Sequence, residues 1–312
     1  LVSMYAKCAS IVEAENVFCG MGEYRNSISW NELVFAYVEQ GCIVKALQLY
    51  KVMQQGYTTP DHWSFVMFLQ ACCLLEDKDR DQLMDESHIR LTSLLIGRAL
   101  HDDAKRMHLA CHLFVGNSLV KMYGKCGSTI EAENAFEQLT HRDVVSWNAM
   151  LSAYVEKSGQ QEKAFTLFEK MLEAGPWPDD ITLVYMLRAC SGTSGSSRLC
   201  RLIHVIVLCI GFDDKRPLLA NTLLHAYGCC SSMPDAQAVF DRLTKKDVTS
   251  WNSLIAGYAQ DGNLNACLEN FERMQGASGI EPDGITFVSM FFAFSHSGFV
   301  DKGMEFFASM SK

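Results

Sequence analysis

Apolar residues recur along this chain at helical spacing, in segments that also resemble one another. The segments SISWNELVFAYVEQG (27–41), VVSWNAMLSAYVEKSG (144–159) and VTSWNSLIAGYAQDG (248–262) each place apolar residues three, four and seven positions after a tryptophan. This spacing puts one apolar face on an α-helix. A glycine ends each segment, where a helix is expected to stop. Each segment is therefore predicted to form one amphipathic helix.

A second amphipathic helix is predicted after each of these glycines. It ends in a glycine and then in Pro-Asp, at 60–61, 178–179 and 282–283. One position breaks its apolar pattern, because Asn270 stands where Leu49 and Leu167 lie in the sister segments. A buried amide at that place would cost about 1–3 kcal/mol unless it finds a partner. The pattern is helix, turn, helix and stop, repeated at about 35 residues.

Another pair of segments, SMYAKCASIVEAENVF (3–18) and KMYGKCGSTIEAENAF (121–136), is identical at most positions. Self-similarity at this scale predicts an array of small units instead of one globular enzyme fold. A single helical pair cannot bury both of its apolar faces, so neighbouring pairs must stack. The expected fold is all-α, an α-solenoid or superhelix of helix-turn-helix repeats with a long concave surface.

Length and composition exclude disorder, since 312 residues with 49% apolar content can bury a large core. The longest nearly apolar run, 202–212, is too short to span a bilayer. No signal or transit peptide is visible. Because the sequence begins inside one unit and stops inside another, we expect a fragment whose N-terminal targeting segment was removed or never included.

Thirteen cysteines raise the question of disulfides or metal sites. No two of them are three residues apart, which excludes the usual zinc-ribbon and thioredoxin spacings. Cys8 and Cys126 recur at one repeat position on an apolar face, so reduced core thiols in a reducing compartment are expected. His108, Cys111 and His112 could face one metal ion, but a polar helix end is the favoured interpretation. No metal and no cofactor is expected in this segment.

The net charge of −9 argues against a nonspecific binder of polyanions. The segment EDKDRDQLMDE (76–86) contributes much of this acidity. Any contact with nucleic acid must therefore rely on base recognition. The chain contains no H-x-E, P-loop or G-x-S-x-G motif, so no catalytic residue is predicted and the segment is not expected to be an enzyme.

An A-x3-F step recurs in the second helices, at 14–18, 132–136 and 236–240. Tetratricopeptide repeats share this step but lack the W-N opening and the Pro-Asp close. The pattern instead resembles pentatricopeptide repeat (PPR) proteins, specifically the plant PLS subclass in which P, L and S variants alternate. The resemblance covers essentially the whole chain.

On this resemblance the chain is a single array, 1–312. Its units are a partial S repeat at 1–26, P at 27–61, L at 62–112, S at 113–143, P at 144–179, L at 180–216, S at 217–247, P at 248–283 and a partial L at 284–312. The L unit at 62–112 is longer than the other, with an acidic excess at about 76–91. We predict that this excess loops out and leaves the stacking intact.

The resemblance implies that the fifth and last residues of each repeat jointly choose one RNA base. The pairs are Asn31 with Asp61, Asn117 with Asp143, Asn148 with Asp179, Asn221 with Asp247, and Asn252 with Asp283. An asparagine amide offers a donor and an acceptor to a base edge, and an aspartate can orient it. The family associates this combination with uridine and then cytidine. The alternative is that the Asn residues cap helices and the Asp residues favour helix N-termini.

The second residue of each repeat is expected to flank the base by apolar contact. These residues are Ile28, Phe114, Val145, Leu218 and Thr249. The L units carry valine at the fifth place, at Val66, Val184 and Val288, and the first two end in His112 and Arg216. Valine cannot hydrogen-bond to a base edge, so the L units should act as spacers. With the N-terminus at the 5′ end, the expected target is U-n-U-U-n-U-U-n.

The resemblance thus implies a sequence-specific single-stranded RNA-binding array, the specificity part of an organellar C-to-U RNA editing factor in the mitochondrion or chloroplast. A deaminase domain would follow this chain or be supplied in trans, and editing cofactor proteins are the other expected partners, with no membrane. An RNA stability or splicing factor of the same family stays open. So does a protein-binding scaffold like tetratricopeptide repeats, although a peptide groove has no need for five Asn/Asp pairs.

Overall fold

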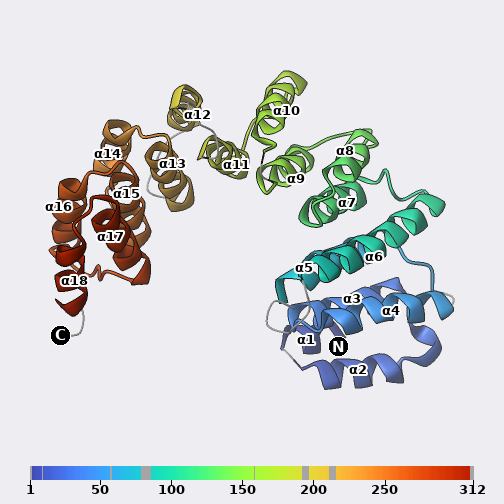
Figure 1. Ribbon diagram of the computed structural model, residues 1–312. Helices are drawn as coiled ribbons and strands as arrows, with labels where there is room; N and C mark the ends of the chain where they lie inside the picture. Colours follow the sequence, from blue (N-terminus) through green and yellow to red (C-terminus); the bar gives the residue numbers. More distant parts are fainter. Residues whose placement is uncertain are drawn as a thin grey trace. The chain divides into compact units, whose positions relative to one another are not determined.

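The computed structural model describes residues 2–8, 10–56, 58–78, 86–157, 159–191, 197–210 and 216–309. Every regular element in these ranges is helical. The helices form two compact units, Leu1–Lys157 and Ser158–Lys312. Each unit is a stack of helical hairpins, as the repeat pattern predicts (Figure 1).

The first unit contains nine α-helices within its described residues. They are α1 (Val2–Lys7), α2 (Ile11–Gly20), α3 (Ser27–Glu39), α4 (Ile43–Gln55), α5 (His62–Lys78), α6 (Glu86–Arg106), α7 (Leu113–Lys125), α8 (Thr129–Glu137) and α9 (Val144–Val155), with a 3-10 turn at Gly22–Tyr24. Helices α1, α3, α5, α7 and α9 pack in sequence against one another as a first-helix layer. Each even-numbered helix packs on the odd-numbered helices beside it.

The second unit repeats this two-layer arrangement. Its helices are α10 (Gln161–Ala174), α11 (Asp180–Ser191), α12 (Ser197–Ile210), α13 (Pro217–Cys229), α14 (Met233–Arg242), α15 (Val248–Gln260), α16 (Leu264–Gln275), α17 (Gly284–His296) and α18 (Val300–Ser309). Here α11, α13, α15 and α17 form the first-helix layer. The predicted α-solenoid is therefore confirmed within each unit.

The tryptophan of each W-N segment is buried against the phenylalanine that ends the A-x3-F step before it. The pairs are Phe18–Trp30, Phe136–Trp147 and Phe240–Trp251, with ring centroids 4.6, 5.1 and 4.6 Å apart and edge-to-face geometry. A basic side chain also lies over the ring of each phenylalanine, from Arg25, Arg142 or Lys246. Consecutive repeats are thus joined by a buried aromatic pair, which accounts for the recurrence of tryptophan.

Glycines permit close contact between neighbouring first helices. A Cβ on Gly124 of α7 would lie 2.6 Å from Cβ of Ala153 on α9, and one on Gly228 of α13 would lie 3.0 Å from Cα of Gly257 on α15. Real Cβ atoms essentially never come as close as 2.6 Å. At these places the layer has no room for a side chain.

We therefore expect Gly124→Ala to lower the free energy of unfolding by about 1–3 kcal/mol, because overpacking must push α7 and α9 apart. Gly20→Ala is the matched control, since a Cβ at Gly20 would meet nothing within 4 Å in helix α2. Alanine favours a helix over glycine, so the control should be neutral or slightly stabilising. Urea unfolding followed by circular dichroism measures both variants, and equal midpoints would contradict the close packing.

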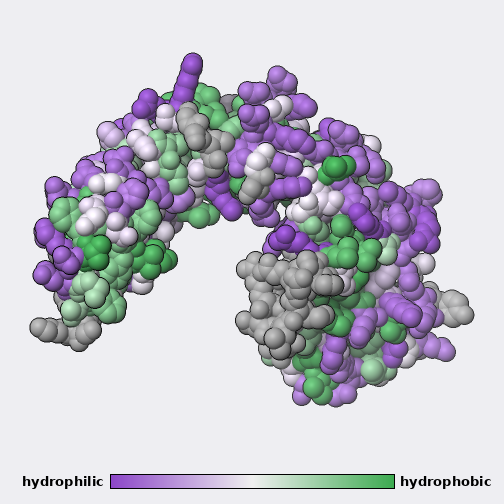
Figure 2. All heavy atoms as spheres, viewed as in Figure 1, coloured by the Kyte–Doolittle hydropathy of each residue, from purple (hydrophilic) through white to green (hydrophobic). Residues whose placement is uncertain are grey.

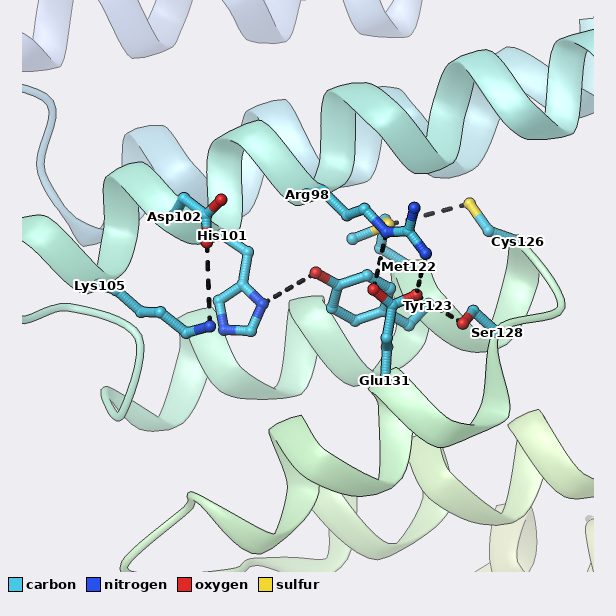
Figure 3. Close-up of polar contacts among 9 residues, drawn as sticks. All are labelled: Arg98, His101, Asp102, Lys105, Met122, Tyr123, Cys126, Ser128 and Glu131. Carbon is cyan, nitrogen blue, oxygen red and sulfur yellow. Dashed lines mark hydrogen bonds and ion pairs between the residues drawn. The ribbon is translucent and has the colours of Figure 1, made fainter.

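The units at 62–112 and 180–216 are each fastened to the unit that follows by the same set of polar contacts. On the first of these junctions, His101 Nδ1 lies 2.8 Å from the Tyr123 hydroxyl, and Arg98 pairs with Glu131 at 2.7 Å (Figure 3). Ser128 donates to the same glutamate, at 2.6 Å. The second junction repeats all three contacts: His204 to Tyr227 at 2.9 Å, Arg201 to Asp235 at 2.9 Å, and Ser232 to Asp235 at 2.7 Å. The matching places of the two histidines in the sequence reflect this repeated junction.

The acidic excess in the first L unit differs in part from the expected loop. Helix α5 continues to Lys78 and α6 begins at Glu86, so both helices extend into the segment 76–91. The loop prediction is wrong at these two ends, and residues 79–85 lie outside the described residues. The packing of α5 on α7 is present beside the insertion.

The cysteines are free thiols in the described structure, and many of them are buried as expected. Cys126 is buried, with its sulfur 3.8 Å from that of Met122. Cys8 is exposed, so the expectation of a core thiol at that place is wrong. Cys126 has α5 and α6 packed beside its helix, whereas no described helix pair precedes α1.

Asn270 is buried, with 3% of its surface exposed, and both ends of its amide are paired. Its Nδ2 donates to the Ala266 carbonyl at 2.8 Å, and its Oδ1 accepts from Arg273 at 3.0 Å. The arginine in turn lies over the ring of Trp251. These bonds remove the desolvation penalty that an unpaired amide would carry.

Polar and apolar residues are interspersed over most of the visible surface, and apolar side chains gather at α17 and α18 (Figure 2). The exposed members there include Phe292, Phe299, Val300, Met304 and Phe307. Among the described helices, none combines the length and the apolar character needed to cross a bilayer.

Candidate nucleic-acid interface

The paired Asn and Asp side chains meet wherever one unit of the structure contains both. The Asn Nδ2 donates to the Asp carboxylate at 3.1 Å for Asn31–Asp61, 3.2 Å for Asn117–Asp143, 3.3 Å for Asn221–Asp247 and 2.9 Å for Asn252–Asp283. Asn148 belongs to the first unit and Asp179 to the second, so that pair stays a prediction. Each asparagine lies in the first two turns of a first helix, buried or half-buried.

Each closing aspartate also caps the helix that follows it. Asp143 accepts from the Ser146 backbone N–H at 2.9 Å, and Asp283 accepts from that of Thr286 at 2.9 Å. One carboxylate therefore both caps a helix and binds the asparagine. The helix-cap interpretation and the Asn-partner interpretation of these aspartates are compatible. The asparagines themselves stand inside their helices, so the helix-cap interpretation is wrong for them.

These bonds keep the carboxylates ionised. Burial opposes the ionisation of Asp61, but the Ser64 backbone N–H and the amide of Asn31 outweigh it and hold the pKa of Asp61 below its ordinary value. The same balance lowers the pKa of Asp143. For Asp283, the backbone N–H of Thr286 is the leading cause of a lowered pKa. These three carboxylates thus carry a full negative charge at neutral pH.

A third residue orients two of the amides, and it was missed in the sequence. Ser64 Oγ donates to Asn31 Oδ1 at 2.7 Å, and Thr286 Oγ1 donates to Asn252 Oδ1 at 2.6 Å. Both hydroxyls occupy the third place of the following repeat. With the oxygen held there and one amide hydrogen given to Asp, the second Nδ2 hydrogen is left as a donor for a ligand. The same place holds Ser146 and Ser250 in two other units, but their hydroxyls bond to Asp143 and Asp247 instead, so the residue type alone does not identify this contact.

The predicted base-flanking residues are exposed although they are apolar. The exposed side chains are those of Ile28, Phe114, Val145, Leu218 and Thr249. By contrast, Trp30, Trp147 and Trp251, which lie two places further along three of these helices, are buried. The same place in the L units holds Trp63, Ile181 and Ile285, which are also exposed and which the sequence analysis did not single out. With the exception of α15, which carries Thr249, these first helices present an exposed apolar side chain beside their Asn or Val.

A pocket of about 350 Å³ in the first unit brings these groups together. Ile28 and Trp63 line it, as do the paired side chains Asn31 and Asp61. The second unit has a cavity of about 480 Å³ that is lined by Asn221, Asp247 and the neighbouring Lys245 and Lys246. The apolar walls and the oriented amide of the first pocket suit a flat heterocycle with a polar edge.

The L units lack this constellation. Val66 and Val184 are half-buried and Val288 is exposed. His112 packs its ring against His62 at 4.5 Å, and Arg216 forms an ion pair with Asp180 at 2.8 Å. The groups that end these units are therefore engaged with the first residue of the same unit.

His108, Cys111 and His112 do not assemble into a ligand set. The described residues contain no group of three or more His, Cys, Asp or Glu side chains placed to hold a metal ion. His108 adopts a positive φ of 57° just after the end of α6, and Cys111 is exposed. These residues lie just beyond the end of α6 and in the turn before α7.

Comparison with known proteins identifies the repeats. A model of the PPR repeat family matches residues 142–192 and 246–296, and a model of the PPR repeat matches 28–56, 117–144, 219–248 and 285–312. The chain is 35% identical to pentatricopeptide repeat-containing protein At2g33680 of Arabidopsis thaliana, over 100% of its own length and 40% of that protein. For At1g11290, chloroplastic, of the same plant, the identity is 33%, with 100% and 36% covered.

A solved structure shares the fold. The pentatricopeptide repeat protein PPR10, crystallised in complex with an 18-nucleotide psaJ RNA element, superposes with a TM-score of 0.56 at 18% identity. The match covers 98% of this chain and 42% of that one. The chain thus spans less than half the length of each of these three proteins.

Proposed function

The chain belongs to the pentatricopeptide repeat family, and on that premise we propose that it binds single-stranded RNA and selects bases at its P and S repeats. The observation that carries this proposal is a hydrogen-bonded Asn–Asp pair beside exposed side chains, which recurs in four repeats. The pairs are Asn31–Asp61, Asn117–Asp143, Asn221–Asp247 and Asn252–Asp283, and the first of them lines a pocket. A base would stack between the apolar residues and meet the amide at its edge.

The amide chemistry suits a pyrimidine edge. At Asn31 and Asn252 the bonds to Asp and from Ser64 and Thr286 leave one amide N–H free to donate, and a uracil or cytosine edge offers an acceptor to such a donor. The family association of Asn with Asp adds uridine as the first choice and cytidine as the second. The proposed target, from its 5′ end, is U-n-U-U-n-U-U-n.

Titration with synthetic RNA tests the proposal. Against the proposed target, an oligonucleotide with a purine at any one of the five U positions should bind more weakly by about 1–3 kcal/mol, because a buried amide then loses its partner. Asn148→Thr should move the preference at the fourth nucleotide toward G, if the family rule applies. Isothermal titration calorimetry measures both affinities. Equal affinity for all oligonucleotides would contradict base selection and would support only the helical stacking.

We further propose that the chain is of the PLS subclass and addresses a C-to-U editing site in an organelle. The relatives At1g11290 and At3g02330 carry "chloroplastic" and "mitochondrial" in their names, which supports an organellar location. The chemistry of deamination needs a zinc-activated water and an acid/base glutamate. A domain C-terminal to this segment or a protein in trans would supply them, and this array would supply the address. Loss of C-to-U conversion next to the bound sequence, in plants that lack the protein, separates editing from RNA stability or splicing.

A further inference from the structure

The pocket beside Asn31 and Asp61 contains a second carboxylate. Glu32 lines this pocket with them, in the turn of α3 that also presents Ile28. The Glu32 side chain is half-buried, and within the described residues it has neither a hydrogen-bond partner nor an ion-pair partner. A charged acceptor is therefore left available to whatever occupies the pocket.

The sister repeats place a small residue at this sixth position. It is Ser118, Ala149, Thr222 or Ser253. Each of the three hydroxyls is turned back to a carbonyl of its own helix: Ser118 to Phe114 at 2.9 Å, Thr222 to Leu218 at 2.7 Å, and Ser253 to Thr249 at 2.9 Å. These side chains offer no comparable acceptor to a ligand, so among the five units that carry an Asn–Asp pair only the one at 27–61 has a carboxylate at the sixth position.

We propose that Glu32 makes this one unit select cytidine over uridine, an inference that rests on the proposed RNA-binding function. Cytosine presents an exocyclic N4 amine, which a glutamate accepts from, beside the N3 acceptor that suits the Asn31 amide. Uracil presents O4 at the N4 place and carries carbonyl oxygens on both sides of its single N–H. A carboxylate that approaches that edge is repelled by these oxygens. The target then begins with C and reads C-n-U-U-n-U-U-n.

The walls of the pocket strengthen this discrimination. Ile28 and Trp63 line the pocket, so a base bound between them would displace water from its edge, and a charge-assisted hydrogen bond is stronger where water is displaced. Trp63 also supplies an aromatic face, and stacking of a base on such a face tolerates any sequence. Stacking therefore provides affinity at this unit, and the two carboxylates and the amide provide the choice of base.

The unit at 248–283 is a matched control within the same chain. Its amide is oriented in the same way, since Asn252 donates to Asp283 at 2.9 Å and accepts from Thr286, as Asn31 does with Asp61 and Ser64. It carries Ser253 in place of Glu32. Ser253→Glu should therefore transfer a preference for cytidine to the seventh nucleotide.

The experiment measures the affinity of the whole chain for four RNAs that carry C, U, A or G at the first position of the target. The unaltered chain should bind the C oligonucleotide about tenfold more tightly than the U oligonucleotide. Glu32→Ala and Glu32→Gln should remove this preference, and Ser253→Glu should create one at its own position. Alanine and glutamine both favour helix, so α3 is not perturbed.

A preference for U, A or G at the first position, or a C preference that survives Glu32→Ala, would overturn the assignment. The proposed function is tested separately, by purines at the other four selected positions. If these do not weaken binding, base selection as a whole fails. If they do, and Glu32 has no effect, only the present inference fails.

Discussion

Trp147→Ala is expected to lower the free energy of unfolding by about 3–5 kcal/mol, as removal of a buried large aromatic does. The indole is 5% exposed and packs edge-to-face on Phe136, with centroids 5.1 Å apart. This pair joins α8 to α9, so its loss leaves a cavity between successive repeats. Chemical unfolding followed by circular dichroism measures the loss. Trp147→Phe keeps a ring against Phe136 and removes a buried Nε1 that has no partner among the described residues, so it should cost clearly less.

Trp63→Ala is the control for this variant, because Trp63 is 46% exposed. It stacks on Phe114 at 5.3 Å, and we expect its loss to cost about 1 kcal/mol or less in stability. It should instead weaken the proposed RNA binding, since Trp63 lines the pocket beside Asn31 and Asp61. Equal destabilisation by the two alanine variants would contradict the division between buried and ligand-facing tryptophans.

Acidification from pH 6.5 to pH 4 is expected to destabilise the chain by about 3 kcal/mol through His101 alone. Burial is the main cause that lowers the pKa of His101 to about 4, and Lys105 adds to it, while Asp102 and Glu131 oppose it (Figure 3). An unfolded histidine titrates near 6.5, so between these values the unfolded chain binds more protons than the folded one. Stability is then complete above pH 6.5 and falls as the pH drops toward 4.

His204 extends the effect to the second unit, since burial lowers its pKa as well. The double variant His101→Gln and His204→Gln should show a much smaller pH dependence in this window, because glutamine stays neutral and can still bond to Tyr123 and Tyr227. Thermal unfolding at several pH values measures this. Asp61, Asp143 and Asp283 have lowered pKa values, so their contribution is lost only below about pH 4. An unchanged slope in the double variant would contradict the buried neutral histidines.

Several features of the site could be predicted because they are encoded by spacing along the chain. The Asn and Asp residues recur at the fifth and last places of the repeats. When one repeat stacks on the next, its last residue must lie at the start of the first helix of that next repeat. The exposed second residues follow from the same period. Glu32 was visible as a departure at the sixth place, but its importance depends on a pocket that Trp63 closes from the next repeat.

The sequence by itself determined the helices, the hairpin repeat, the stacking and the identity of the recurring amide and carboxylate pairs, because helical periodicity and repeat length are local properties of the chain. Tertiary structure alone decided which atoms meet across repeats. It placed the hydroxyl of Ser64 on the amide oxygen of Asn31 and that of Thr286 on the amide oxygen of Asn252, and it paired His101 with Tyr123. These outcomes depend on the distance and rotation between neighbouring helices. Close packing sets both quantities, and the periodicity of the sequence does not specify them.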